Sequence, residues 1–199
     1  MDCIYLHGFA SGPLSEKAVY FSRRLREKEF DVVVPDLNLP TFEQMTVSSQ
    51  LKIVEALLAG KNPRSVLLVG SSMGGLLSTM LSTKHESISG LVLLAPGFGL
   101  DRRWQSVFGE GALETWREQG FLEVHHYAYD RVMPLAVSFL DDALKYQTDK
   151  LRVSIPTLVV HGKQDDVVPV EESIAFAELN PDYVNLHVVD DDHFLQSNL

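Results

Sequence analysis

The sequence predicts a three-layer α/β/α sandwich built on a mostly parallel sheet of six strands. Short apolar runs alternate with longer amphipathic stretches, which is the order expected of parallel strands joined by crossover helices. The apolar runs also carry hydrophobic residues at consecutive positions, as expected of strands that are covered on both faces. With 199 residues, 45% of them hydrophobic, the chain is long enough for a single domain, residues 1–199, with a large core.

The expected strands share two features: they are short and continuously apolar, and turn formers follow them. In chain order they are Cys3–Leu6, Asp31–Pro35, Ser65–Val69, Ser89–Ala95, Ile155–His161 and Val184–Val189. The first is followed by a glycine-rich loop over residues 7–13, and the fourth stops at Pro96-Gly97.

The expected helices lie between these strands and show apolar residues on one face. They run over Ser15–Lys28, Val47–Leu58, Met73–Lys84 and Val170–Leu179. In the first, Ala18, Phe21 and Leu25 recur at helical spacing, and in the second Leu51, Val54 and Leu58 do so, with Gly60 and Pro63 just beyond its end.

The stretch over residues 98–150 interrupts this pattern. Eight of the eighteen aromatic residues lie between residues 100 and 150, too many for a plain connection. We expect helices here, including Ala112–Gln119 and Leu135–Tyr146, that form a small helical cap inserted after the fourth strand. The alternative is an ordinary helical crossover whose aromatic side chains pack on the sheet.

The composition restricts the class of protein. A net charge of −10 and a pI near 5.1 argue against nucleic acid as a partner, because a polyanion needs a basic face. The single cysteine, Cys3, excludes an internal disulfide and a thiolate cluster for a metal, and its place in an apolar run indicates a core residue. The sequence shows neither a signal peptide nor an apolar run of 18 residues, so we expect a cytoplasmic protein without a membrane span.

The central motif is Gly70-Ser71-Ser72-Met73-Gly74, which joins the third expected strand directly to a helix. A strand that enters a helix through G-x-S-x-G makes a sharp turn and holds its serine at the apex. Side chains at the two flanking glycines would collide with the neighbouring strand and helix. Ser72 is therefore the candidate nucleophile, although a strand and a helix joined by a capping serine would look similar.

The candidate partners of Ser72 follow other strands. In a parallel sheet the loops after the carboxyl ends of the strands face one crevice. His193, in the loop after the sixth strand, is the candidate base, and Asp165, after the fifth, is the candidate acid that orients it. Asp166 and Asp101 are the alternative positions for the acid.

The negative oxygen of an acyl intermediate needs two N–H donors. We expect one from the backbone of Met73, at the start of a helix where the dipole favours negative charge. The second is expected from the loop after the first strand, at Phe9 or alternatively Ala10. We expect His7 to brace this loop by hydrogen bonds rather than to transfer protons.

With these motifs, the sequence resembles the α/β-hydrolase superfamily over nearly its whole length. Within it, His7-Gly8-Phe9, Gly70–Gly75, Gly162–Pro169 and Asp192-His193-Phe194 resemble the small bacterial YqiA-like esterases. The resemblance implies a carboxylesterase or thioesterase that acts on small acyl esters through an acyl-enzyme, without a cofactor. It also implies that Ser72 attacks, Asp165 orients, His193 shuttles the proton, and Phe9 and Met73 stabilise the oxyanion.

Other functions fit parts of the pattern. The same triad cleaves amides or carbon–carbon bonds in other settings, and a hydrolase scaffold without turnover would be a binding protein. A metal site at residues 190–193 or at His125-His126 is a weaker interpretation, since neither cluster shows a spaced ligand set. The Gly70–Gly75 stretch lacks the glycine spacing and the lysine of nucleotide-binding loops. The oligomeric state is not predicted.

Overall fold

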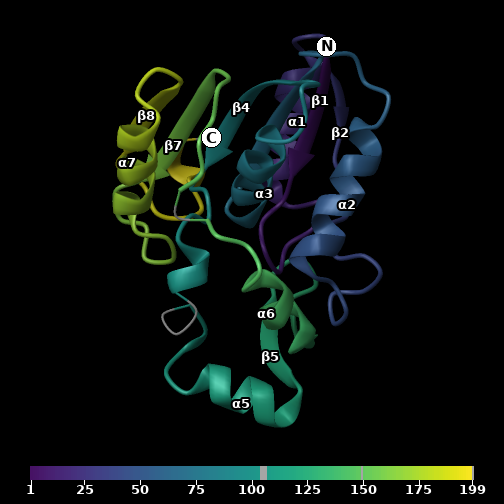
Figure 1. The fold of residues 1–199 in the computed structure, drawn as a ribbon, viewed down its shortest axis with the longest axis vertical. Helices are drawn as coiled ribbons and strands as arrows, with labels where there is room; N and C mark the ends of the chain where they lie inside the picture. Colours follow the sequence, from purple (N-terminus) through teal and green to yellow (C-terminus); the bar gives the residue numbers. More distant parts are fainter. Residues whose placement is uncertain (104–106, 149, 199) are drawn as a thin grey trace.

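The structure is a computed structural model that describes residues 1–103, 107–148 and 150–198. Six strands form one sheet in the order β2-β1-β3-β4-β7-β8 (Figure 1), and every neighbouring pair is parallel. These strands are β1 (Asp2–Leu6), β2 (Asp31–Val33), β3 (Val66–Ser71), β4 (Ile88–Leu94), β7 (Thr157–Gly162) and β8 (Val184–Val189). Each lies within about two residues of its expected run, so the predicted six-stranded parallel sheet is confirmed.

Four helices cover the two faces of the sheet, as the predicted sandwich requires. They are α1 (Glu16–Arg26), α2 (Val47–Leu58), α3 (Met73–Ser82) and α7 (Val170–Leu179). Side chains of α2, α3 and α7 pack into one hydrophobic core, whereas Ala18, Phe21 and Leu25 of α1 pack into a second core with Cys3 and Val69. Strand residues alternate between the faces, which divides the buried side chains between these two cores. None of the helices among the described residues combines the length and the apolar composition needed to cross a membrane.

The segment between β4 and β7 is only partly helical. Its elements are a short helix η1 (Leu100–Arg102), α5 (Ala112–Gln119), β5 (Phe121–His126), β6 (Arg131–Ala136) and α6 (Ser138–Ala143). The helix predicted over Ala112–Gln119 is confirmed. The helix predicted over Leu135–Tyr146 is wrong at its start, because residues 121–136 form an antiparallel hairpin and α6 begins only at Ser138. The expectation of a purely helical cap is corrected accordingly.

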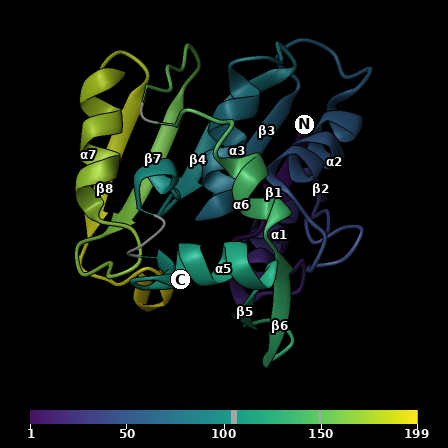
Figure 2. The same cartoon turned by 60° about the horizontal axis from the view of Figure 1, so that its bottom comes forward.

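This hairpin segment lies beyond the carboxyl edge of the large sheet, as Figures 1 and 2 show. Hydrogen bonds attach it to the core and brace it internally. The N–H of Tyr127 donates to the carbonyl of Ala10 at 2.8 Å, and that of Ala136 donates to the carbonyl of Glu43 at 2.9 Å. Within the segment, the buried indole of Trp116 donates to the carbonyl of Leu135 at 2.8 Å. The hairpin therefore contacts the loop that follows β1.

The strand register brings the loops that matter to one edge. Leu6 of β1 pairs with Gly70 of β3, and Ser71 pairs with Leu94 of β4. Further along the sheet, Gly162 of β7 pairs with Val189 of β8. Because the paired strands end at the same level, the residues that follow them share a single rim.

Candidate active site

The turn between β3 and α3 holds Ser72 in a conformation that serine rarely adopts. Its backbone has φ 51° and ψ −117°, outside the regions favoured by L-residues. Its N–H donates to the carbonyl of Leu94 at 2.9 Å, and its carbonyl accepts N–H groups of Gly75 and Gly97, both at 2.9 Å. The surrounding hydrogen bonds therefore hold the strained residue in place.

The two glycines of the motif are required by close contacts. A Cβ at Gly70 would lie 2.4 Å from the carbonyl oxygen of Gly74, inside α3. A Cβ at Gly74 would lie 2.1 Å from the carbonyl oxygen of Leu6, at the end of β1. These distances give the steric reason for G-x-S-x-G that the sequence suggested: α3 starts too close to two strands for any side chain.

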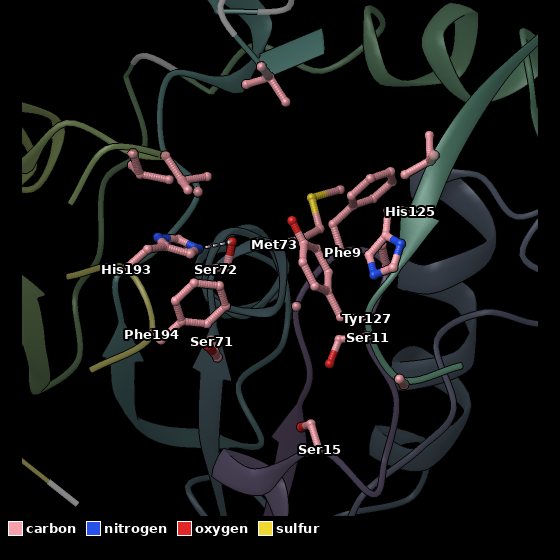
Figure 3. A pocket seen from close by; sticks show the side chains of 18 of the residues that line it. Phe9, Ser11, Ser15, Ser71, Ser72, Met73, His125, Tyr127, His193 and Phe194 are labelled. Atoms are coloured by element: carbon pink, nitrogen blue, oxygen red, sulfur yellow. Dashed lines mark hydrogen bonds between the residues drawn. The ribbon is translucent and has the colours of Figure 1, made fainter. Parts of the chain in front are cut away.

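Ser72, His193 and Asp165 form one hydrogen-bonded chain. The Nε2 atom of His193 lies 3.1 Å from the Ser72 Oγ, and its Nδ1 lies 2.7 Å from the Asp165 Oδ2. Figure 3 marks the hydrogen bond between His193 and Ser72. Because the carboxylate only accepts, Nδ1 carries the proton and Nε2 is the acceptor for the serine hydroxyl. The structure thus brings together the three side chains that the sequence singled out.

The Asp165 carboxylate is fully buried and receives several donors. Its Oδ1 accepts the N–H groups of Val167 at 2.9 Å and Val168 at 2.7 Å, while Oδ2 faces His193 and also His161 at 3.1 Å. Burial by itself would raise the pKa of Asp165, but the hydrogen bonds from the two imidazoles and from Val168 outweigh it and hold the pKa far below its usual value. The carboxylate is therefore ionised at neutral pH.

The two alternative positions for the acid differ from Asp165. Asp166 is exposed to solvent. The side chain of Asp101 lies outside the part of the structure that is described, although its backbone belongs to η1. Asp165 is the carboxylate that contacts His193.

A second buried imidazole, His161, supports Asp165, and the sequence analysis gave it no role. Its Nε2 is 2.9 Å from the carbonyl of Val168 and 3.1 Å from the Asp165 carboxylate, so this nitrogen carries the proton. Its Nδ1 accepts the hydroxyl of Ser173 at 2.7 Å. The available signal was its position at the end of β7, four residues before Asp165.

The loop that carries His193 is fixed from several directions. Gly162 allows a close approach, since a Cβ there would lie 2.3 Å from the carbonyl oxygen of Asp192. The Asp192 side chain accepts the N–H of Phe194 at 2.8 Å, and the buried Leu195 packs into the core on the α1 side. Lys17 of α1 adds a long hydrogen bond, 3.4 Å, from its Nζ to the carbonyl of His193.

Backbone N–H groups at the rim are available for an oxyanion. Phe9, Ala10 and Met73 line the same cavity as Ser72. In the described ranges, none of their N–H groups donates a hydrogen bond. His7 braces the loop as expected: its Nδ1 donates to the carbonyl of Gly8 at 2.9 Å, and its Nε2 accepts the N–H of Leu37 at 3.0 Å.

A cavity of about 880 Å³ opens beside Ser72 and His193 (Figure 3). One part of its wall is apolar and includes side chains of the segment between β4 and β7, among them Phe108, Leu122, Val124 and Phe139. Another part is polar and borders α1. Pockets of this size and mixed lining are typical of sites for small organic molecules.

Within the described chain, no three histidine, cysteine or carboxylate side chains are grouped as metal ligands. His125 and His126 are neighbours on β5, and their side chains leave the strand on opposite faces: His125 is exposed and His126 is buried. At residues 190–193, the His193 imidazole is instead occupied by Ser72 and Asp165.

The parallel sheet, the strained serine turn and the order serine, aspartate, histidine define the α/β-hydrolase fold. Solved structures of other proteins show the same fold. Alpha/beta hydrolase domain-containing protein 10 from mouse is 21% identical with a TM-score of 0.78, covering 98% of this chain and 82% of its own. Est1E from Butyrivibrio proteoclasticus with bound ferulic acid is 23% identical with a TM-score of 0.74, covering 96% and 80%. The Pyrococcus furiosus esterase Pf2001 is 20% identical with a TM-score of 0.68, covering 99% and 77%.

The sequence profile of the family described as "Uncharacterised protein family (UPF0227)" matches residues 2–197. The chain therefore belongs to the UPF0227 family, and the resemblance stated from the sequence is confirmed. No curated protein sequence matches the chain.

Proposed function

We propose that the protein is a serine hydrolase that cleaves carboxylic esters or thioesters by way of an acyl-enzyme. The observation that carries this proposal is the hydrogen-bonded chain from Ser72 through His193 to Asp165, with Ser72 at the apex of a strained turn. A serine hydroxyl becomes an effective nucleophile when an adjacent base removes its proton and a third group orients that base. The hydrolase folds of the structural neighbours are consistent with this chemistry.

In the acylation half, the Ser72 oxygen attacks the carbonyl carbon while its proton passes to Nε2 of His193. Asp165, already ionised, holds the imidazole in the required tautomer and stabilises the imidazolium. The N–H groups of Met73 and Phe9 bind the oxyanion, where each such donor contributes about 10²–10³-fold to the rate. The carbon–oxygen or carbon–sulfur bond then breaks, and the leaving group takes the proton from His193.

In the deacylation half, water attacks the acyl group on Ser72 and gives its proton to His193. The second tetrahedral intermediate uses the same N–H donors, and its collapse releases the carboxylic acid and returns the proton to Ser72. All groups needed for both halves belong to this chain, so the proposal requires no cofactor.

The test is hydrolysis of p-nitrophenyl acetate and butyrate by the wild type and by Ser72→Ala. We expect the variant to lose activity by at least about 10³-fold, because the nucleophile is gone. Ser82→Ala, which removes a hydroxyl from the far end of the same helix, is the matched control and keeps wild-type activity. Equal rates from the wild type and Ser72→Ala would contradict the proposal.

Labelling by a fluorophosphonate probe separates this function from its alternatives. Labelling of Ser72 together with ester hydrolysis supports the proposal. Labelling without hydrolysis of any ester or thioester in a panel would favour cleavage of amides or carbon–carbon bonds. Absence of labelling in the folded protein would favour a binding protein on a hydrolase scaffold.

A further inference from the structure

The cavity beside Ser72 extends onto both faces of the sheet. Its apolar arm, defined by Phe9, Phe108, Leu122, Val124 and Phe139, belongs to the core shared with α2 and α3 and to the segment between β4 and β7. Its polar arm, defined by Tyr5, Ser15, Glu16, Lys17 and Ser71, lies on the opposite face, under α1.

Strand alternation explains why the polar arm lies there. Cys3 and Val69 pack into the core on the α1 side, so Tyr5 and Ser71, two residues further along β1 and β3, point to the same face. Lys17 lies one helical turn before Phe21, whose ring stacks on Tyr5 with centroids 6.2 Å apart. The lysine is therefore directed toward the carboxyl ends of these strands.

The Lys17 ammonium has few interaction partners among the described residues. The Lys17 side chain is half-buried, and desolvation lowers its pKa to about 8 although three aspartates at longer range oppose that shift. Its only hydrogen bond among the described residues is the 3.4 Å contact with the carbonyl of His193, and Asp165, Asp191 and Asp192 act on it only through longer-range electrostatics. An ammonium has three donors and the protein uses one of them weakly, so donors remain for a ligand.

Hydroxyl groups of the polar arm also have hydrogen-bonding capacity that the described residues leave open. The Tyr5 hydroxyl is buried beside Ser71, yet it makes no hydrogen bond of normal geometry within residues 1–103, 107–148 and 150–198. Ser15 precedes α1 without capping it through its side chain. Buried hydroxyls in proteins are nearly always hydrogen-bonded, and an orphaned one at a cavity indicates an absent partner.

The geometry of the reaction decides which half of an ester enters each arm. His193 returns its proton to the leaving atom, so the leaving group must lie on the imidazole side of Ser72. Figure 3 shows His193 and Phe194 on one side of Ser72, and Phe9 and Met73 on the other. Because Lys17 contacts the residue that carries the imidazole, the polar arm adjoins the leaving group, and the apolar arm receives the acyl chain.

We infer that the substrates are esters or thioesters of an apolar acyl group with an alcohol or thiol that carries a carboxylate, which Lys17, Tyr5 and Ser71 bind in the polar arm. This inference rests on the proposed hydrolase function and names its substrate class. A carboxylate fits better than a phosphate, since one lysine lines the arm while Glu16 lines it too and Asp165, Asp191 and Asp192 contribute negative potential nearby. Hydrogen bonds between ionised partners are stronger than neutral ones, so a carboxylate on the leaving group adds selectivity as well as affinity.

The test compares two matched substrates, 4-butyryloxybenzoate and its methyl ester, which differ in the charge of the leaving group. Each kcat/KM is divided by the rate of alkaline hydrolysis of the same ester, to remove differences in intrinsic reactivity. We expect the wild type to prefer the charged ester by about 10- to 100-fold. Lys17→Met is expected to abolish the preference and Tyr5→Phe to reduce it, while Lys28→Met, an exposed lysine just after α1, retains it.

Each result bears on a different claim. If the wild type cleaves both esters with equal corrected rates, the carboxylate site is refuted while the hydrolase stands. If Lys17→Met slows both esters by the same factor, Lys17 only positions the His193 loop, and the site is refuted as well. If neither ester is cleaved, both proposals fall. The wild-type ratio decides the matter even where a variant does not fold.

Discussion

The sharpest structural prediction concerns Gly74, because it ties the packing of α3 to the position of Ser72. In Gly74→Ala, the new Cβ would lie 2.1 Å from the carbonyl oxygen of Leu6 and 2.8 Å from that of His7. Ordinary van der Waals contact begins at 3.4 Å. The obstructing atoms are backbone atoms, which cannot rotate away as a side chain can, so α3 and the end of β1 must separate by about 1 Å.

The size of the effect follows from that displacement. Overpacking of this kind costs about 1–3 kcal/mol, and in a chain of this length each kcal/mol lowers Tm by roughly 2–4 °C. The movement also shifts the N–H of Met73 and the loop of Phe9 relative to Ser72. A misplacement of about 1 Å among reacting groups reduces the rate by about 10²-fold. We therefore expect Gly74→Ala to lose both stability and turnover.

The assay is thermal unfolding together with kcat/KM on p-nitrophenyl butyrate. Gly12→Ala is the matched control, because a Cβ there would meet only the side chain of Ala128, at an ordinary distance of 3.4 Å. It should keep the wild-type Tm and activity. A Gly74→Ala protein with wild-type Tm and wild-type kcat/KM would refute the close approach of α3 to β1, and with it our account of the serine turn.

Three further predictions test other parts of the molecule. In Asp165→Asn, the carbonyl oxygen of the amide can still accept the N–H groups of Val167 and Val168, so we expect the protein to fold. Steady-state kinetics should show kcat lowered by about 10²–10⁴-fold, because the imidazole loses its orienting carboxylate. An unchanged kcat would exclude Asp165 as the orienting acid. His126 is buried against Phe42 and lacks a hydrogen-bond partner in the described residues, and burial lowers its pKa. As the pH drops below about 6.5, the His126 imidazole is protonated in the unfolded chain before it is protonated in the folded one, so the free energy of unfolding falls. In urea titrations, His126→Phe should show a smaller fall in this free energy between pH 7 and pH 5. An identical fall in the variant would show that His126 is not its source. Val124→Trp fills the apolar arm, so kcat/KM should decrease more for octanoyl than for acetyl p-nitrophenyl esters, whereas a uniform change would place the acyl chain elsewhere.

Most of the large sheet could be predicted because its signals are local. A parallel strand covered on both faces must be continuously apolar, and this alone locates β3 and β4 within one or two residues. The turn at Ser72 was equally visible, since steric contacts at Gly70 and Gly74 leave no other residue type there. In both cases a short stretch of sequence contains the physical cause.

The hairpin was missed because its cause is not local. Strand β5 does alternate, with Phe121, Glu123 and His125 exposed, but its turn lacks an Asn-Gly or Asp-Gly pair and places Asp130 at a φ of 48° instead. Pro134 in β6 also argued against a strand, although an edge strand tolerates it. An isolated two-stranded hairpin is marginal, so its stability comes from docking on the loop after β1.

The candidate site also contains residues that the sequence predicts and one that it does not. Ser72, Asp165 and His193 could be predicted because each follows a strand, and parallel strands end on one rim. Lys17 could not, since its contact with His193 joins residues 176 positions apart. Nothing in the amphipathic pattern of α1 distinguishes this half-buried lysine from the exposed Lys28 just beyond the helix.

The two arms of the cavity come from different parts of the fold, and this has a consequence for selectivity. Val124 belongs to the hairpin and packs against the core shared with α2 and α3, whereas Lys17 belongs to α1, on the other face of the sheet. Substitutions without shared partners add within about 0.3–0.5 kcal/mol. In Val124→Trp combined with Lys17→Met, acyl-chain selectivity should therefore change as in the first single variant and carboxylate selectivity as in the second. Strong coupling between them, measured as a double-mutant cycle in kcat/KM, would mean that one part of the ester occupies both arms.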